Sequence, residues 1–329
     1  MKKEILTVIS NRPVDALSKV YQMELSGCSE EQRPGQFVNI ELDGLFLRRP
    51  ISVCDWKDGV LTLLYKLVGK GTALMATLQP GARLDVLCSL GNGFDIDVPA
   101  LTRPDVPTIA GPDIPALTRP DVPTIAGFDV PALTRPLLVG GGIGTAPLYL
   151  LARRLKERGV SPTVILGFNT ASEIIYEKEF KALGLRTLVT TVDGSYGTPG
   201  FVTAALPLLA SASAPSTVGD SGYAPSSVGD SVSDPSSVAA SVSDSSTVGD
   251  SVSDPSSVGA SGYDYCYACG PMPMLRALAP KLASPAQFSL EERMGCGTGI
   301  CMGCTCPQLT GTKRICKDGP VFRLDEISF

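Results

Sequence analysis

Four cysteines near the end of the 329-residue chain constrain its folding more than any other feature. Cys296, Cys301, Cys304 and Cys316 follow the spacing C-x4-C-x2-C-x11-C, and glycines occupy positions 295, 297, 299 and 303. A glycine-rich loop lets backbone amides approach the sulfur atoms and stabilise metal-bound thiolates. The first part of the spacing is that of plant-type [2Fe-2S] clusters, in which each iron takes two thiolates. A four-thiolate zinc site is the alternative, although zinc ribbons usually pair two C-x2-C knuckles and this region has one.

The chain has ten cysteines and no histidine. A protein without histidine cannot form a Rieske centre, a histidine-ligated haem or a hydrolase with a histidine base. The start of the chain lacks the apolar run of an export signal, so we expect a cytoplasmic protein in which clustered thiols mark metal or redox chemistry. Cys306 is expected to be a bystander beside the cluster. Four other cysteines are expected to be buried core thiols: Cys28, Cys54, Cys88 and Cys266.

Charge and hydropathy exclude two classes of partner. The net charge is -5 and the pI is about 5.0, and the chain has no basic arm, so nucleic-acid binding has no electrostatic support. The longest apolar stretch, residues 137–152, contains four glycines and a proline. That composition favours a strand, a loop and a helix over a membrane span.

Two stretches differ in composition from the rest. The run ALTRPDVPTIAG at residue 100 recurs at residue 116, and ALTRP returns at residue 132, a period of 16. Residues 214–263 hold five decapeptides of the type (A/D)PSSVGDSVS. Neither stretch has enough apolar side chains to offset the entropy lost on ordering, and neither period matches a solenoid repeat. We expect both to be extended or disordered surface insertions.

The remaining sequence predicts three structured parts. Short β-rich runs separated by Gly and Pro turns are typical of a small antiparallel barrel. Strand-loop-helix units from residue 137 onward indicate a parallel α/β domain, in which Gly159 ends the first helix. We therefore predict a barrel at 1–94, a Pro-rich insertion at 95–136, an α/β domain at 137–285 with a low-complexity insertion at 211–263, and a small cluster domain at 286–329.

A glycine turn within the barrel region is the first candidate binding site. Arg49-Pro50-Ile51-Ser52 opens one β-rich run, Leu64-Tyr65-Lys66 lies in the next, and Gly69-Lys70-Gly71-Thr72 then begins a short helix. The amide donors at such a helix start suit a diphosphate, and Arg49 and Lys66 could add charge-assisted contacts. Each signal is weak by itself, because RPxS occurs by chance and GKGT could be an ordinary turn.

A second glycine loop follows the first strand of the α/β region. Gly140, Gly142 and Gly144 lie in GGGIGT, and Thr145 replaces the last glycine of the dinucleotide fingerprint, so the match is partial. Asp193 opens the turn DGSYG, and Cys269-Gly270-Pro271 follows a strand and enters another helix. The plain alternative for Cys269 is a packed thiol at the end of a strand.

The order of these motifs resembles the ferredoxin-reductase superfamily, in which RPxS and a later G-x-G-T helix start hold FAD. With the terminal cysteines and the stretch at 292–296, the chain is similar to one family, the electron-transfer subunits of dihydroorotate dehydrogenase B. The resemblance implies FAD contacts at Arg49, Pro50, Ile51, Ser52, Leu64, Tyr65, Lys66, Gly71 and Thr72. It implies NAD contacts at Gly140, Gly142, Gly144, Thr145, Asp193, Cys269, Gly270 and Pro271. It also implies a [2Fe-2S] cluster on Cys296, Cys301, Cys304 and Cys316.

The resemblance further implies an oxidoreductase subunit of pyrimidine biosynthesis. A partner subunit with FMN would oxidise dihydroorotate, in a heterotetramer with two copies of each subunit. Electrons would pass through the cluster and FAD to NAD+, and this chain would supply no catalytic residue to the substrate. One alternative is a related subunit that moves electrons between NAD(P)H and ferredoxin or sulfur compounds. Another is a non-redox scaffold whose four cysteines hold zinc.

Overall fold

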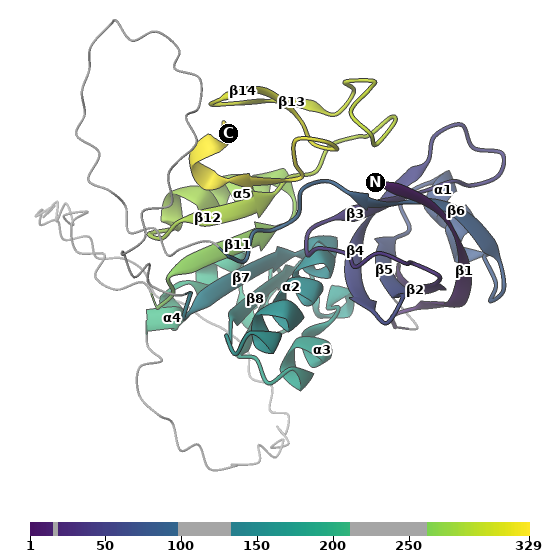
Figure 1. Ribbon diagram of the computed structural model, residues 1–329. Helices are drawn as coiled ribbons and strands as arrows, with labels where there is room; N and C mark the ends of the chain where they lie inside the picture. The colour runs from purple at the N-terminus through teal and green to yellow at the C-terminus, as the bar shows by residue number, and fades with distance from the viewer. Residues whose placement is uncertain (16–18, 98–132, 211–261) are drawn as a thin grey trace, which may run out of the picture.

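Alternation of buried and exposed residues closes the N-terminal strands into an antiparallel barrel (Figure 1). In the last of these strands, for example, Leu84, Val86 and Cys88 are buried in the barrel core and the residues between them are less buried. The barrel order is β1-β2-β5-β4-β3-β6. The strands are β1 (Lys2–Pro13), β2 (Val20–Ser26), β3 (Phe37–Ile40), β4 (Arg49–Lys57), β5 (Val60–Lys66) and β6 (Arg83–Leu90), and helix α1 (Lys70–Ala76) follows β5.

The α/β region forms a seven-stranded sheet in the order β10-β9-β8-β7-β11-β12-β15. All its pairings are parallel except that of β15 with β12. The chain runs outward from β7 to β10 on one side, then returns to add β11 on the other side of β7. The strands are β7 (Pro136–Gly141), β8 (Thr163–Phe168), β9 (Thr187–Thr191), β10 (Thr198–Pro199), β11 (Tyr265–Cys269), β12 (Ala286–Ser289) and β15 (Val321–Arg323).

Short helices connect these strands. The longest of them is α2 (Ala146–Glu157), whose Leu148, Leu151 and Leu155 are buried in the core. The α-helices that follow are α3 (Glu177–Ala182), α4 (Pro207–Ala210) and α5 (Met272–Leu278). The 3-10 turns are η1 (Gly142–Thr145), η2 (Ala171–Glu173), η3 (Val202–Ala205), η5 (Ala279–Lys281) and η6 (Leu324–Glu326).

Helix α2 also joins the two larger parts of the molecule. It packs on β4 of the barrel, and its Leu150 is buried among barrel side chains. On the same helix, Arg153 donates from Nε to the Asp55 carboxylate at 2.9 Å and from Nη2 to the Trp56 carbonyl at 2.5 Å. An apolar contact and a charged one therefore hold the barrel against the sheet.

The C-terminal residues contribute to both the sheet and a small hairpin. Strands β12 and β15 extend the α/β sheet, while β13 (Thr305–Gln308) and β14 (Gly311–Arg314) pair with each other and lie beyond the edge of the sheet (Figure 1). The cysteine-rich loop at 296–304 connects β12 to the hairpin. The cluster loop is thus held between the last parallel strand and the hairpin.

This computed structural model describes residues 1–15, 19–97, 133–210 and 262–329. The predicted antiparallel barrel and parallel α/β domain are confirmed, and so are the four buried core thiols. Most of the two repeat stretches lies outside the described residues. Their predicted character and the predicted domain limits stay predictions. Within the described ranges no helix is both long and apolar enough to cross a membrane.

Candidate cofactor sites

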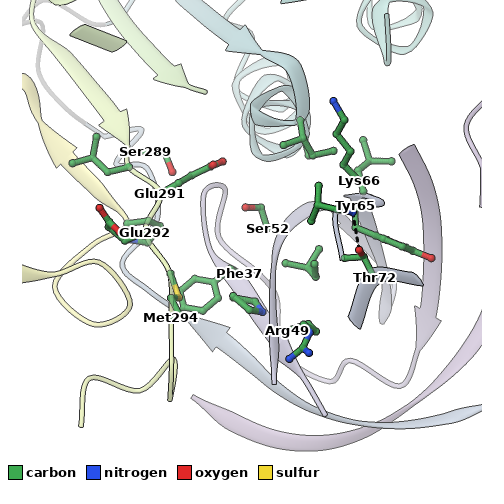
Figure 2. A pocket seen from close by; sticks show the side chains of 18 residues that line it. Phe37, Arg49, Ser52, Tyr65, Lys66, Thr72, Ser289, Glu291, Glu292 and Met294 are labelled. Carbon is green, nitrogen blue, oxygen red and sulfur yellow. Dashed lines mark hydrogen bonds between the residues drawn. The ribbon is translucent and has the colours of Figure 1, made fainter. Parts of the chain in front are cut away.

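A cavity of about 440 Å³ opens where the barrel, the start of α2 and the chain after β12 meet. Of the nine residues predicted for FAD, eight line it: Arg49, Pro50, Ile51, Ser52, Leu64, Tyr65, Lys66 and Thr72. Figure 2 shows Ser52 between two walls, with Lys66, Tyr65 and Thr72 on one side and Glu291 and Met294 on the other. A mostly apolar cavity with a few charged groups at its rim suits a large planar ligand with a phosphate tail.

The ninth predicted residue, Gly71, does not line the cavity and lies against Arg49, which does. The Arg49 side chain lies directly over Gly71, so that a Cβ at position 71 would stand 2.7 Å from the arginine Cδ and Cζ. Arg49 also donates to the Leu47 carbonyl. The glycine in the first turn of α1 therefore leaves the space that the guanidinium occupies beside the helix start. A cation and free amide donors meet there, as an anionic diphosphate requires.

Two predicted residues line the cavity while their hydroxyls are engaged with the protein. Thr72 Oγ1 accepts from the backbone of Val68 at 3.0 Å and Gly69 at 3.2 Å, which caps α1. Tyr65 donates to Asn11 Oδ1 at 2.8 Å, and burial raises the pKa of its hydroxyl. These side chains shape the wall of the cavity and its helix turn.

Lys66 stands between the cavity and a second hollow. The second hollow is lined by Lys66 together with Gly142 and Ile143 of the predicted dinucleotide loop, and by Phe168 at the end of β8. The ammonium group of Lys66 lies 3.7 Å from the carboxylate of Glu173. One cation therefore borders both the predicted flavin site and the predicted nicotinamide nucleotide site.

The GGGIGT loop and the Cys269-Gly270-Pro271 motif meet at the carboxyl ends of neighbouring strands. Cys269 at the end of β11 pairs with Gly140 of β7. A Cβ on Gly144 would lie 2.6 Å from the Cys269 carbonyl carbon and 2.7 Å from Gly270, and a Cβ on Gly141 would lie 3.1 Å from Pro271. The strand order reverses between β7 and β11, and ligands of open α/β sheets bind at such a point.

The side chains of Cys269, Thr145 and Asp193 at this edge differ in burial and in hydrogen bonding. Cys269 is buried, and burial raises the pKa of its thiol, so it packs in the strand end as a neutral group. The Thr145 hydroxyl is buried and has no hydrogen-bond partner among the described residues. Asp193 accepts from the Ser195 hydroxyl at 2.6 Å and from its amide at 3.0 Å, which lowers the pKa of Asp193 and fixes the turn after β9.

The cluster cysteines lie as two pairs. The Cys296 amide donates to Cys301 Sγ at 3.4 Å and the Cys301 amide to Cys296 Sγ at 3.5 Å. The Cys316 amide donates to Cys304 Sγ at 3.4 Å. In the described part of the chain, no three of these thiols come within 4.8 Å of one another. Two pairs suit the two irons of a [2Fe-2S] cluster better than one tetrahedral zinc.

Backbone amides in the cluster loop point at sulfur. Besides the contacts within the pairs, Thr298 donates to Cys296 Sγ at 3.3 Å and Gly303 to Cys301 Sγ at 3.4 Å. Burial acts to raise the pKa of Cys296, but hydrogen bonds from Thr298 and Cys301 outweigh it and lower that pKa to about 5. The loop therefore stabilises the thiolate of Cys296, the form that binds iron, whereas burial raises the pKa of Cys316 to about 12.

The chain after β12 connects the cluster to the cavity, and sequence reasoning assigned it no role there. Glu291, Glu292 and Met294 line the cavity, and Cys296 follows two residues after Met294. The Glu291 side chain is open to the cavity, yet enough protein surrounds it that desolvation raises the pKa of its carboxyl. The similarity of residues 292–296 to one family was the available signal for this segment.

A barrel strand also reaches the cluster loop. Asn39 of β3 is fully buried and donates from Nδ2 to the Cys296 carbonyl at 3.2 Å. On the other side of the loop, Cys301 is exposed, as are its neighbours Ile300 and Met302, whereas Cys304 and Cys316 are buried. One cluster pair is therefore open to the surface while the loop is anchored to the barrel.

Comparison with known proteins decides the family. The profile of the iron-sulfur cluster binding domain of dihydroorotate dehydrogenase B matches residues 291–328. The dihydroorotate dehydrogenase B (NAD(+)) electron transfer subunit of Bacillus caldolyticus is 37% identical, with 99% of this chain and 98% of the relative covered. The subunit of Fusobacterium nucleatum subsp. nucleatum is 34% identical, with 99% of both chains covered. The chain belongs to the family of dihydroorotate dehydrogenase B electron transfer subunits.

Solved structures agree with this family of electron transfer subunits. A structure of the NADH-dependent reduced ferredoxin-NADP oxidoreductase has a TM-score of 0.67 and 26% identity, and covers 99% of this chain and 90% of its own. The ferredoxin reductase of carbazole 1,9a-dioxygenase shares the fold, with a TM-score of 0.54 and 17% identity over 87% of this chain and 68% of its own. The resemblance inferred from the motifs and the predicted fold class are both confirmed.

Proposed function

We propose that this chain is a flavin and iron-sulfur oxidoreductase subunit that passes electrons from dihydroorotate, oxidised on a partner subunit, to NAD+. The partner is the dihydroorotate dehydrogenase catalytic subunit with FMN, and the assembly is a heterotetramer of two copies of each subunit. The observation that carries the proposal is the continuity of the three sites. The segment that lines the flavin cavity runs directly into the cluster loop, and Lys66 borders both the cavity and the nucleotide hollow.

The cavity residues fit FAD in a defined way. When bound, FAD exchanges single electrons with the cluster and a hydride with the nicotinamide. Arg49 and the start of α1 would hold its diphosphate, with Gly71 keeping the approach open. The apolar wall formed by Pro50, Ile51 and Leu64 would exclude water from the flavin ring. No acid or base of this chain is required for hydride transfer, which suits a protein without histidine.

The nucleotide and cluster residues complete the route. NAD would bind at the sheet edge where β7 and β11 meet. The glycines there would let the nucleotide approach the backbone closely: Gly140, Gly142 and Gly144. The other predicted NAD contacts would surround it: Thr145, Asp193, Cys269, Gly270 and Pro271. Cys296 and Cys301 would hold one iron, and Cys304 and Cys316 the other. The exposed side of Cys301 is the side on which a partner could bring its own redox group near the cluster.

The alternative is a subunit that moves electrons between NAD(P)H and ferredoxin, and the likeness to the ferredoxin-NADP oxidoreductase structure favours it. The higher identity over nearly the full length of the dihydroorotate dehydrogenase B relatives outweighs that likeness. The zinc scaffold has less support, because the four thiols lie in two pairs.

An anaerobic titration of the purified protein with NADH tests the redox route. We expect the flavin band and the broader iron-sulfur band in the visible spectrum to bleach together. A colourless protein with zinc on its thiols would overturn the proposal. A second titration with dihydroorotate separates the two redox candidates. Bleaching that occurs only after the FMN partner is added supports the dihydroorotate dehydrogenase subunit. No bleaching in the presence of that partner favours the ferredoxin alternative.

A further inference from the structure

A second group of metal-binding side chains lies at one end of the barrel. Glu4, Cys28 and Cys88 each place one ligand atom within 4.8 Å of the other two. Both cysteines are fully buried, whereas the Glu4 side chain is about nine-tenths buried. In the described ranges this is the single group of three or more such residues, and the [2Fe-2S] cysteines are not part of it.

Strand pairing brings the group together from distant parts of the sequence. Glu4 of β1 is opposite Val86 of β6, so Glu4 and Cys88 share the inner face of the barrel wall. Cys28 follows β2 after a turn at Gly27, whose φ is +95°. The Gly59 carbonyl holds this turn by accepting from the Gly27 and Cys28 amides at 3.2 and 3.1 Å. Three separate segments therefore fix the three ligand atoms in place.

The surroundings are built to orient the group. The Cys28 thiol donates to the Glu30 carbonyl at 3.6 Å, and Gln32, itself buried, donates from Nε2 to Cys28 Sγ at 3.5 Å. The amide of Ser89 donates to Gln32 Oε1 at 3.0 Å, which fixes the orientation of that glutamine. Lys2 lies 3.2 Å from the Glu4 carboxylate and is partly exposed, as is Ser29. The group is therefore rigid on its inner side and reachable from the Lys2 side.

We propose that Glu4, Cys28 and Cys88 form a binding site for a divalent cation of the zinc class. Two thiolates and a carboxylate are ligands that zinc prefers, and tetrahedral bonds of about 2.3 Å to sulfur and about 2.1 Å to oxygen place the ligand atoms about 3.5 to 3.8 Å apart. The observed spacing admits that geometry. The fourth position falls to water or to the Ser29 hydroxyl, which already contacts Glu4.

The charges balance on binding. Each thiol releases one proton to solvent as its sulfur binds the cation, and Glu4 binds as the carboxylate. Two thiolates and one carboxylate around a divalent cation leave one negative charge, and the ammonium of Lys2 lies beside it. The site ties the first strand of the barrel to the last strand and to the loop after β2, independently of electron transfer.

Zinc retention by the full-length protein with its cluster and FAD tests the site. Protein equilibrated with Zn²⁺ and washed with a weak chelator is analysed for zinc, iron and FAD per chain. We expect one zinc in addition to full iron in the wild type and in a Cys266→Ala control, which removes a buried thiol from outside the group. A Cys28→Ala/Cys88→Ala variant should retain full iron and FAD but no zinc.

Two further measurements keep the test decisive if that variant fails to fold. Glu4→Gln keeps the shape of the side chain and should weaken zinc binding about tenfold or more, since even residues behind a metal ligand typically contribute that much. A cadmium-113 spectrum of the wild type should show a resonance of a site with two sulfur ligands. Zinc content in the wild type equal to that of the double variant, or a mass lower by two hydrogens from a Cys28–Cys88 disulfide, would overturn the proposal.

Discussion

At the scale of single residues, the space between Gly71 and Arg49 makes a sharp test of the flavin site. Gly71→Ala places a methyl group where the arginine lies, so Arg49 must move away from the start of α1. We expect FAD affinity to fall about tenfold, about 1.4 kcal/mol, in a fluorescence titration of the apoprotein. Gly69→Ala is the matched control, because nothing lies within 4 Å of its Cβ position, and it should bind FAD nearly as the wild type does.

The outcome also separates binding from helix stability. Alanine within a helix is favoured over glycine by about 0.5–1 kcal/mol, so Gly71→Ala should not loosen α1 by itself. Weaker FAD binding with an unchanged or raised unfolding temperature would therefore place the effect in the displaced arginine. Equal FAD affinities for the two alanine variants would contradict the predicted role of Gly71.

Two cysteine variants test the cluster ligands at the same scale. Cys301→Ser should lose the iron-sulfur absorbance and keep FAD, because the cavity does not include Cys301. Cys306→Ser is the matched control, since Cys306 is two residues from Cys304 but is engaged by Gln308 Nε2 at 3.1 Å, outside the two thiol pairs. Iron and acid-labile sulfide per chain measure the result. A full cluster in the Cys301 variant would show that another thiol takes its place.

At the scale of elements, α2 is the joint between barrel and sheet. Arg153→Met removes the hydrogen bonds from α2 to Asp55 and Trp56 on β4 and leaves their partly buried oxygens without this partner. We expect the free energy of unfolding to fall by about 2 kcal/mol, measured as a lower midpoint in urea with FAD present. Arg158→Met is the control: it breaks a pair of exposed charges with Asp97 and should change stability by less than about 1 kcal/mol. Equal shifts for both variants would argue against α2 as the joint.

Some elements of the fold could be predicted from sequence patterns, and others could not. The barrel strands and β7 could be predicted because their alternation and apolar runs are local. Strand β15 could not, because Val321–Arg323 has only three residues and its pairing with β12 depends on contacts far along the chain. Within the site, RPxS and GGGIGT were recognisable motifs. Glu291 and Met294 were not, because their place in the cavity follows from how β12 ends against the barrel.

At the scale of the whole molecule, the described chain stops at residue 210 and resumes at residue 262, on either side of the second repeat stretch. A Cβ at Gly262 would lie 2.6 Å from the Leu209 carbonyl oxygen, so these two positions are neighbours, and Tyr263 is already part of the core. Replacing residues 211–261 by a short Gly-Ser linker should therefore leave FAD and iron per chain unchanged. Absorbance and iron analysis of the purified variant measure this, and loss of either cofactor would show that the stretch supports the fold.

The hydrogen bond between Asn39 and Cys296 affects how fast electrons can pass between the cluster and the flavin. Electron tunnelling slows steeply as the gap between donor and acceptor widens, so even small movements of a surface loop would change its rate. Asn39 is buried in the barrel that forms the flavin cavity, and it holds the backbone of the first cluster cysteine. This hydrogen bond therefore ties the first cluster cysteine to the barrel, which limits how far the cluster loop can move from the flavin cavity.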